Sequence, residues 1–105
     1  MDYKGKRWER VRAAVLRRDG YQCQLSKRLG KRVEGNTVHH IFPASLFPEW
    51  CFDPWNLITL SPAMHNRLHD RDGDLLTAEG LELLRRTARK NNIDADIYCQ
   101  RLGEK

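Results

Sequence analysis

Along the chain, apolar residues recur first with a helical spacing and then in short extended runs. Residues 6–19 carry apolar side chains three, four and one positions apart, which predicts an amphipathic helix. Its apolar stripe consists of Trp8, Val11, Val15 and Leu16. The next segment, 21–25, is short and partly apolar, and we expect it to be extended. Residues 27–36 are rich in glycine and basic side chains, which is typical of a loop or a loose hairpin.

Two β-prone runs follow, separated by a proline-rich stretch. The first run, 38–42, contains two adjacent histidines, whose side chains point to opposite faces of an extended strand. The second run, 57–60, is followed by Ser61 and Pro62, which resemble an N-cap and a proline at the first helical position. Residues 43–54 between the runs are irregular, and we expect their aromatic side chains to pack on the core rather than stack on bases.

Two further helices are predicted toward the C-terminus, after an acidic turn at residues 70–74. Thr77 caps the first, which runs to about Asn91, and the second begins at Asp94. The residues expected to pack are Leu81, Leu83, Leu84 and Ala88 in the first helix and Ile97, Cys99 and Leu102 in the second. Strand, loop, strand and helix, flanked by other helices, predict a small single α+β domain over residues 1–105.

Charge is distributed unevenly along this chain of 105 residues, which is long enough for a modest core. The formal net charge is +5, but residues 1–32 carry +8 and residues 33–105 carry −3. If a metal site lies beside it, this basic segment is suited to bind a phosphodiester substrate. A basic segment without such a site is better explained as a charged helix surface exposed to solvent. Residues 27–36 are equally consistent with a plain exposed loop. Candidate nucleic-acid contacts are Arg10, Arg17, Arg18, Lys27, Arg28 and, more weakly, Arg67.

The cysteines and the apolar runs bear on where the protein works. There are three cysteines, an odd number without CxxC spacing, which argues against a disulfide framework and suits a reducing compartment. No apolar run approaches the ~18 residues that a membrane span needs, and the first residues do not begin a signal peptide. We therefore expect a cytoplasmic protein that does not contact membranes.

All the histidines of the chain lie within residues 38–69. On a helix that starts at Pro62, His65 and His69 lie on one face and can reach the same ion. His39 and His40 point to opposite faces of their strand, so that one can bind metal while the other stays free. A metalloprotease is excluded, because the HExxH motif needs a glutamate as its base and this HxxxH segment has asparagine there.

This order of residues resembles the HNH nuclease family and its ββα-metal fold. The pattern is a paired histidine at the end of a strand, Asn56 before an apolar strand, a histidine nine residues later and another after four more. It is closest to the colicin-type branch, and it extends over roughly residues 8–70. Many family members hold a structural zinc in two CxxC knuckles, and we expect none here. The corresponding positions are Cys23, Ser26, Ser61 and Met64.

The resemblance implies a metal-dependent DNA endonuclease that leaves a 5′ phosphate and a 3′ hydroxyl. We assign His39, His65 and His69 as ligands of one divalent ion, and His40 as the general base that deprotonates water. Asn56 cannot transfer protons, so we expect it to bond the backbone of the preceding loop and orient His40, or alternatively to touch the metal. Imidazole ligands favour Mn²⁺, Co²⁺, Ni²⁺ and Zn²⁺ over Mg²⁺.

A second function class uses the same residues differently. In a non-catalytic module, the histidines would hold a structural zinc and the basic helix would bind nucleic acid. A structural site closes its coordination shell, whereas a catalytic site keeps an open position that faces a free base. For the enzyme we expect a prokaryotic or phage origin and a monomer or weak homodimer without a small-molecule cofactor. One active site cuts one strand, so we expect a monomer to nick and only a dimer or a second encounter to break both strands.

Overall fold

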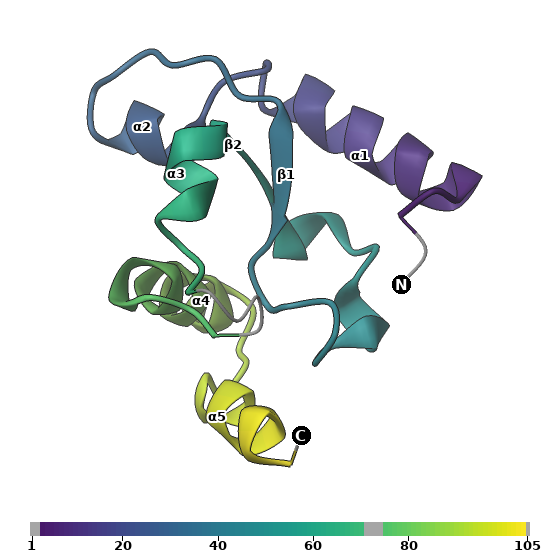
Figure 1. The fold of residues 1–105 in the computed structure, drawn as a ribbon, viewed down its shortest axis with the longest axis vertical. Helices are drawn as coiled ribbons and strands as arrows, with labels where there is room; N and C mark the ends of the chain where they lie inside the picture. The colour runs from purple at the N-terminus through teal and green to yellow at the C-terminus, as the bar shows by residue number, and fades with distance from the viewer. Residues whose placement is uncertain (1–2, 71–74, 105) are drawn as a thin grey trace.

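The computed structural model describes residues 3–70 and 75–104, and an antiparallel pair of short strands lies at its centre (Figure 1). β1 (Thr37–His40) pairs with β2 (Leu57–Leu60), with His40 opposite Leu57. Helix α1 (Lys6–Arg18) lies to the right of β1 in Figure 1, and helix α3 (Pro62–Asn66) lies to its left. This arrangement confirms the predicted α+β fold.

The main core is built from β2, the loop after β1 and the C-terminal helices. Phe42 and Phe47 are fully buried, and the Phe42 ring meets those of Phe47 and Trp50 edge-on at 5.0 and 5.1 Å. Leu60 and Leu84 belong to the same buried cluster. The aromatic residues of the loop therefore pack on the core, as predicted from their pattern.

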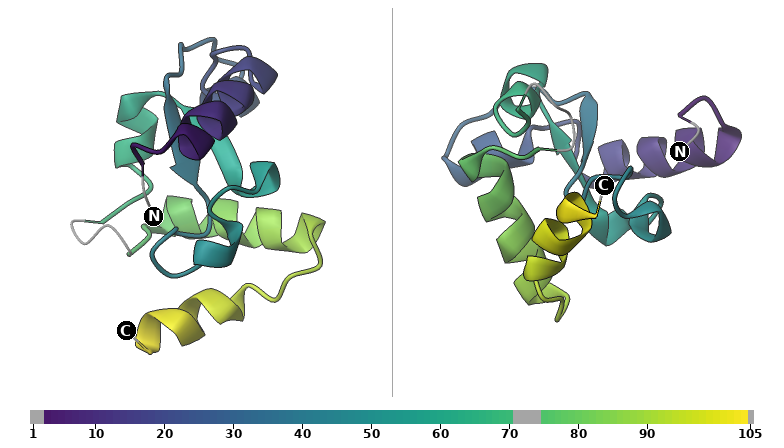
Figure 2. Two further views of the ribbon diagram at one scale, coloured as in Figure 1. Left: turned by 90° about the vertical axis from the view of Figure 1, so that its right-hand side faces the viewer. Right: turned by 60° about the horizontal axis from the view of Figure 1, so that its bottom comes forward.

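Helix α4 (Ala78–Lys90) and helix α5 (Asp96–Gly103) complete the fold below the strands (Figure 2). The Gly80 amide donates to the Thr77 hydroxyl at 3.3 Å, so Thr77 is the N-cap of α4, as predicted. The prediction that Cys99 packs inward is wrong, since Cys99 is exposed. Tyr98 is buried in its place, and its hydroxyl accepts a hydrogen bond from the Leu76 amide at 3.1 Å.

Residues 21–36 differ from the prediction of an extended segment followed by a loop. Helix α2 (Gln24–Arg28) forms there instead. The Cys23 amide donates to the Val33 carbonyl at 2.8 Å, and the Ser26 hydroxyl donates to Cys23 Sγ at 3.2 Å. The bond between Cys23 and Val33 closes the segment on itself, and the bond between Ser26 and Cys23 fixes the first turn of the helix. Because the first bond joins residues ten positions apart, local spacing does not reveal it.

Two expectations are only partly addressed by the described residues. Most of the acidic turn predicted at 70–74 falls outside them. Among the helices of 3–70 and 75–104, none has both the length and the apolar character for crossing a membrane.

Asp19, at the C-terminal end of α1, ties this helix to β2. Its carboxylate accepts a hydrogen bond from the Thr59 amide at 3.0 Å and pairs with Arg18 at 2.8 Å. Burial by itself would raise the pKa of Asp19, but the hydrogen bonds from Arg18 and Thr59 outweigh it and hold that pKa below its usual value. The charged form of Asp19 therefore stabilises the folded state.

Replacing Asp19 by asparagine should lower the free energy of unfolding at neutral pH by about 1–3 kcal/mol, because a charged hydrogen bond is lost. Since the folded-state pKa is depressed, the stabilisation is present above the unfolded-state pKa of ~3.9 and is lost as the pH falls through the folded value. Thermal melts should thus show the Asp19→Asn and wild-type midpoints converging in acid. A gap that stays constant down to the lowest pH contradicts this role, and the exposed Glu82→Gln serves as control.

Candidate active site

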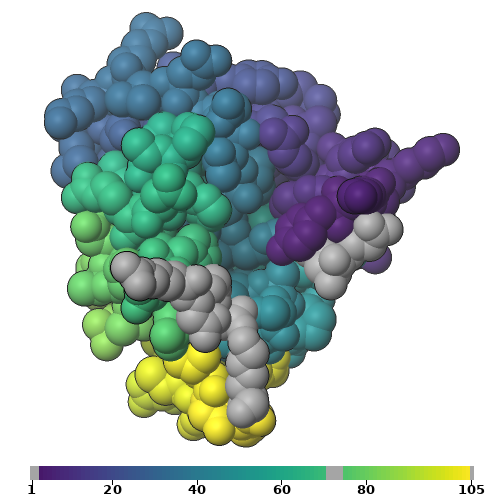
Figure 3. Space-filling view, viewed as in Figure 1, coloured from purple at the N-terminus to yellow at the C-terminus, as the bar shows by residue number. Residues whose placement is uncertain are grey.

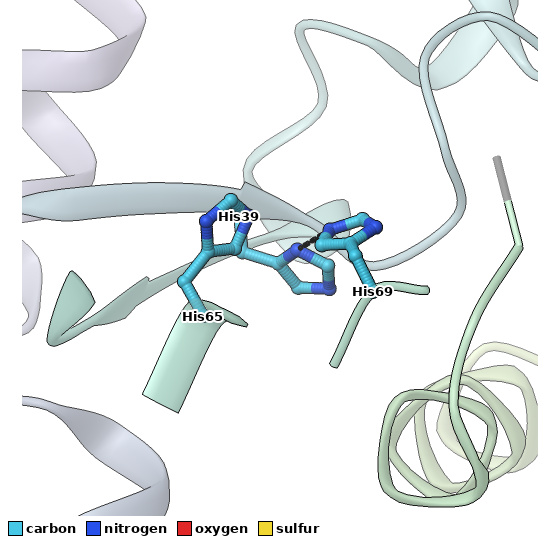
Figure 4. A group of neighbouring side chains, drawn as sticks. All are labelled: His39, His65 and His69. Carbon is cyan, nitrogen blue, oxygen red and sulfur yellow. Dashed lines mark hydrogen bonds between the residues drawn. The ribbon is translucent and has the colours of Figure 1, made fainter. Parts of the chain in front are cut away.

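Three imidazoles converge beside β1 (Figure 4). His39 extends from β1, His65 from α3, and His69 from the segment that follows α3. One nitrogen from each ring can be chosen so that all three lie within 4.8 Å of one another. His39 Nδ1 and His69 Nε2 are 3.0 Å apart. The structure thus brings together the three histidines that the sequence predicts as metal ligands.

His69 reaches this cluster by a different route from the one predicted. Helix α3 ends at Asn66, so the expectation that His65 and His69 stack on one helix face is wrong. The Leu68 carbonyl accepts a hydrogen bond from the Thr77 amide at 3.0 Å, so the backbone here bonds to a distant segment rather than to a further helical turn. The ring centroids of His65 and His69 nevertheless lie 4.8 Å apart.

Electrostatics favours neutral imidazoles at His39 and His65. Burial is the main reason why the pKa of His39 lies well below its usual value, and the neighbouring His69, His65 and His40 add to it. Burial and His69 likewise lower the pKa of His65. His39 Nε2 is buried without a hydrogen-bond partner among the described residues, a costly state unless a ligand satisfies it. Neutral nitrogens with available lone pairs are what a divalent ion requires.

His40 points to the other face of β1, as strand alternation predicts. Its Nε2 lies 2.9 Å from the Cys51 carbonyl oxygen. A carbonyl can only accept, so Nε2 carries the proton and Nδ1 keeps the lone pair. Burial lowers the pKa of His40, and the hydrogen bond to Cys51 opposes that effect. The ring therefore offers one basic atom in a defined tautomer.

Asn56 is fully buried in a short 3₁₀ turn, η2 (Pro54–Asn56), immediately before β2. Its Oδ1 accepts from the Phe42 amide at 2.8 Å, and its Nδ2 donates to the carbonyls of Phe42 and Trp50 at 3.1 and 3.2 Å. These bonds tie both ends of the loop that carries Cys51. Asn56 is not among the described residues that line the histidine cleft. The geometry therefore favours a role in holding the loop backbone, and with it His40, over direct contact with a metal.

All four histidines line one open cleft of about 600 Å³. Tyr3, Ser45 and Asn66 also contribute to its walls. The segments that form it meet on the face shown in Figure 3, where the green surface of α3 and the purple N-terminal segment flank the blue surface of β1. Both histidines of the pair thus border the cleft, although each is largely buried.

The structure commits two of the predicted nucleic-acid contacts to other partners. The guanidinium of Arg18 donates to the carbonyls of Pro54 and Leu57 at 2.8 and 2.7 Å, besides pairing with Asp19. Arg67 forms an ion pair with Glu79 at 3.1 Å. The donors of Arg18 are thus largely used within the fold, whereas the Arg67–Glu79 pair is exposed and leaves Arg67 accessible. Both residues stay predicted nucleic-acid contacts, with Arg18 the less favoured.

The remaining basic candidates are exposed on two helices. Arg10 and Arg17 lie on α1, and Lys27 and Arg28 lie on α2. None of these side chains is part of the cleft wall formed by the described residues. Contact with a long substrate such as a nucleic acid would therefore extend beyond the cleft.

A solved structure is similar to this chain, namely that of an HNH endonuclease from the deep-sea thermophilic bacteriophage GVE2, determined with a manganese ion. The two are 38% identical with a TM-score of 0.61, and the match covers 62% of this chain and 71% of that chain. The chain belongs to the HNH endonuclease family. It is therefore a nuclease, and the histidine spacing predicted the family correctly. The colicin-type branch stays a prediction. No family model and no curated protein matches the chain.

The positions at which many HNH proteins carry zinc-binding cysteines lie together in this HNH enzyme. The Ser26 hydroxyl bonds to Cys23 Sγ at 3.2 Å, and the Met64 amide donates to the Ser61 hydroxyl at 3.2 Å. Burial alone would raise the pKa of Cys23, but hydrogen bonds from Ser26 and Ser61 lower it overall. Hydroxyl and thioether groups stand where a zinc knuckle needs thiolates, and they join two segments by hydrogen bonding and packing.

Proposed function

We propose that this HNH enzyme is a metal-dependent DNA endonuclease that hydrolyses phosphodiester bonds with one divalent ion and a histidine general base. The observation that carries the proposal is that the two adjacent histidines of β1 have different surroundings. His39 joins His65 and His69 on one face, while His40 is held separately on the other and lines the same cleft. The manganese ion in the GVE2 structure supports a divalent ion.

The donor set fits such an ion. His39, His65 and His69 supply three imidazoles, which suit borderline ions such as Mn²⁺, Co²⁺, Ni²⁺ and Zn²⁺ better than Mg²⁺. Three protein ligands leave positions open for substrate, unlike a closed structural site. A bound ion would neutralise charge on the phosphate and stabilise the departing 3′ oxygen.

His40 is suited to accept the proton of the attacking water. Its Nε2–H group is oriented by the Cys51 carbonyl, which leaves Nδ1 as the accepting atom and stabilises positive charge on the ring. Asn56 acts indirectly, because its three backbone bonds set the loop that presents Cys51. Hydrolysis in this manner yields a 5′ phosphate and a 3′ hydroxyl.

The rival, a non-catalytic zinc-stabilised module, is less well supported. Its histidines would need a closed coordination shell, whereas the cluster here lies in an open cleft. It also gives no role to His40, whose proton position is set by Cys51. We therefore favour catalysis, with one histidine cluster among the described residues of each chain and nicking as the first event.

The decisive experiment incubates metal-free protein with supercoiled plasmid and a panel of divalent ions. We expect nicked circles to appear first, faster with Mn²⁺, Co²⁺ or Ni²⁺ than with Mg²⁺, and poor turnover with Zn²⁺ despite tight binding. EDTA should stop the reaction. Cleavage that continues undiminished in EDTA, or no cleavage with any ion, would count against the proposal.

The basic surface of α1 should contribute to binding mainly through phosphates. Charge reversal at Arg10 and Arg17 should each lower the slope of log Kd against log salt by ~0.9 on duplex DNA. Binding is measured by fluorescence anisotropy in EDTA, so that cleavage does not interfere. Arg89→Glu, on the exposed side of α4, is the matched control and should leave the slope unchanged. Equal slopes for the α1 variants and the wild type would show that Arg10 and Arg17 do not contact the DNA phosphates.

A further inference from the structure

The imidazole of His40 is enclosed by aromatic side chains from the N-terminal part of the chain. The Trp8 ring stacks on it, with centroids 5.0 Å apart and planes inclined by 20°. Tyr3 meets His40 edge-on at 6.0 Å and Trp8 at 5.7 Å. Trp8 is only 6% exposed and His40 only 8%. The face of the imidazole is therefore covered by a flat, almost parallel surface.

Both supports of His40 are linked through α1. Trp8 packs with Val15 and Leu57, which anchors this helix on the strands. The Arg7 guanidinium lies 4.2 Å from the centre of the Phe52 ring, next to the residue whose carbonyl bonds His40 Nε2. Helix α1 thus holds the stacking partner of His40 and contacts the loop that supplies its hydrogen-bond acceptor.

A hydrogen bond at one ring nitrogen fixes the position of that atom, but it leaves the ring plane free to tilt. Stacking removes this freedom, because a tilted imidazole would lose contact with the indole face. Proton transfer depends on the direction of the Nδ1 lone pair, and catalytic groups must be held to within about 10–20° of the productive geometry. A tilt of the His40 ring should therefore affect the rate of proton transfer, rather than the stability of the fold.

We propose that Trp8 is a positioning residue that fixes the plane of the His40 imidazole, so that Nδ1 faces the water to be deprotonated. This inference rests on the proposed function of His40. It differs from the interpretation of Trp8 as one of several equivalent core residues on the apolar stripe of α1. Val15 belongs to the same packing cluster, and its replacement perturbs the helix without removing the aromatic stack.

A double-mutant cycle separates the two roles. Trp8→Leu, Trp8→Phe and Val15→Ala are made in the wild type and in His40→Ala. Single-turnover cleavage of a duplex oligonucleotide is then measured with Mn²⁺, well below each melting midpoint. We expect Trp8→Leu to lower the rate about tenfold or more with DNA and Mn²⁺ affinities unchanged, since misorientation loses part of the contribution of the base. Trp8→Phe should retain a rate within about threefold, because a ring remains to stack.

In the His40→Ala background, Trp8→Leu should have no further effect, because Trp8 acts only through the missing ring. An equal loss in both backgrounds, or an equal loss from Val15→Ala, would show a merely structural role and overturn the proposal. If Trp8→Leu does not fold, Trp8→Phe carries the same cycle, its smaller loss again being confined to proteins that contain His40. If His40→Ala instead cleaved DNA at the wild-type rate, His40 would not be the general base, and the proposed function would fail. That outcome differs from additive losses of Trp8→Leu and His40→Ala, which would refute only the positioning role of Trp8.

Discussion

Replacing His40 by alanine is expected to lower the rate of DNA cleavage by ~10²–10⁴-fold, the usual contribution of a general base. The affinity for Mn²⁺ should stay close to that of the wild type, because His40 lies on the opposite face of β1 from the three clustered histidines. Single-turnover cleavage of a duplex gives the rate, and calorimetric titration of the metal-free protein gives the affinity. The combination of lost activity with retained metal binding is the signature expected of a base.

A matched control for this substitution is Asn66→Ala, which also changes a side chain of the cleft wall and should keep most of the activity. Added imidazole should restore part of the rate to His40→Ala and none to Asn66→Ala, since only the former lacks a base. Loss of Mn²⁺ binding in His40→Ala would mean that the roles of the histidine pair are reversed.

Replacing His39 by aspartate is expected to raise the ratio of Mg²⁺-supported to Mn²⁺-supported cleavage, by a factor on the order of ten, whatever the absolute rate. The wild-type cluster offers three imidazoles, and the substitution introduces one hard anionic oxygen, the kind of ligand that Mg²⁺ prefers. Initial nicking rates of both proteins across a concentration series of each ion give the ratio.

The control for this second prediction separates coordination from simple charge. Asn66→Asp places the same negative charge on the cleft wall without entering the proposed ligand set, so its Mg²⁺/Mn²⁺ ratio should match that of the wild type. A ratio in His39→Asp that is unchanged, or no higher than in Asn66→Asp, would remove His39 from the ligands.

Local spacing predicted the parts of the site that depend on neighbours in sequence. Strand alternation is sufficient to place His39 and His40 on opposite faces, and it is seen in their different ring partners. The position of His69 could not be obtained in this way. The backbone before it bonds to Thr77, and a partner so far along the chain leaves no trace in the spacing of α3.

Contacts between distant parts of the chain also explain why the sequence did not predict the surroundings of the basic residues and of Trp8. A pattern of positive charges does not tell whether a guanidinium bonds a carbonyl of another element, as Arg18 does with Leu57, or remains exposed, as Arg10 does. Trp8 fits the apolar stripe of a helix equally well with or without an imidazole above it. Helix α2 was missed because the bond between Cys23 and Val33 that closes it is not local.

The central claim is that an ion held by His39, His65 and His69 enables cleavage of the phosphodiester bond. The most direct test titrates metal-free protein with Mn²⁺ and measures, on the same samples, the bound metal and the single-turnover rate of plasmid nicking. We predict one ion per chain, a rate that rises in proportion to occupancy, and loss of both in His65→Ala. A rate that saturates before the ion binds, or that persists in His65→Ala without bound metal, would contradict the account.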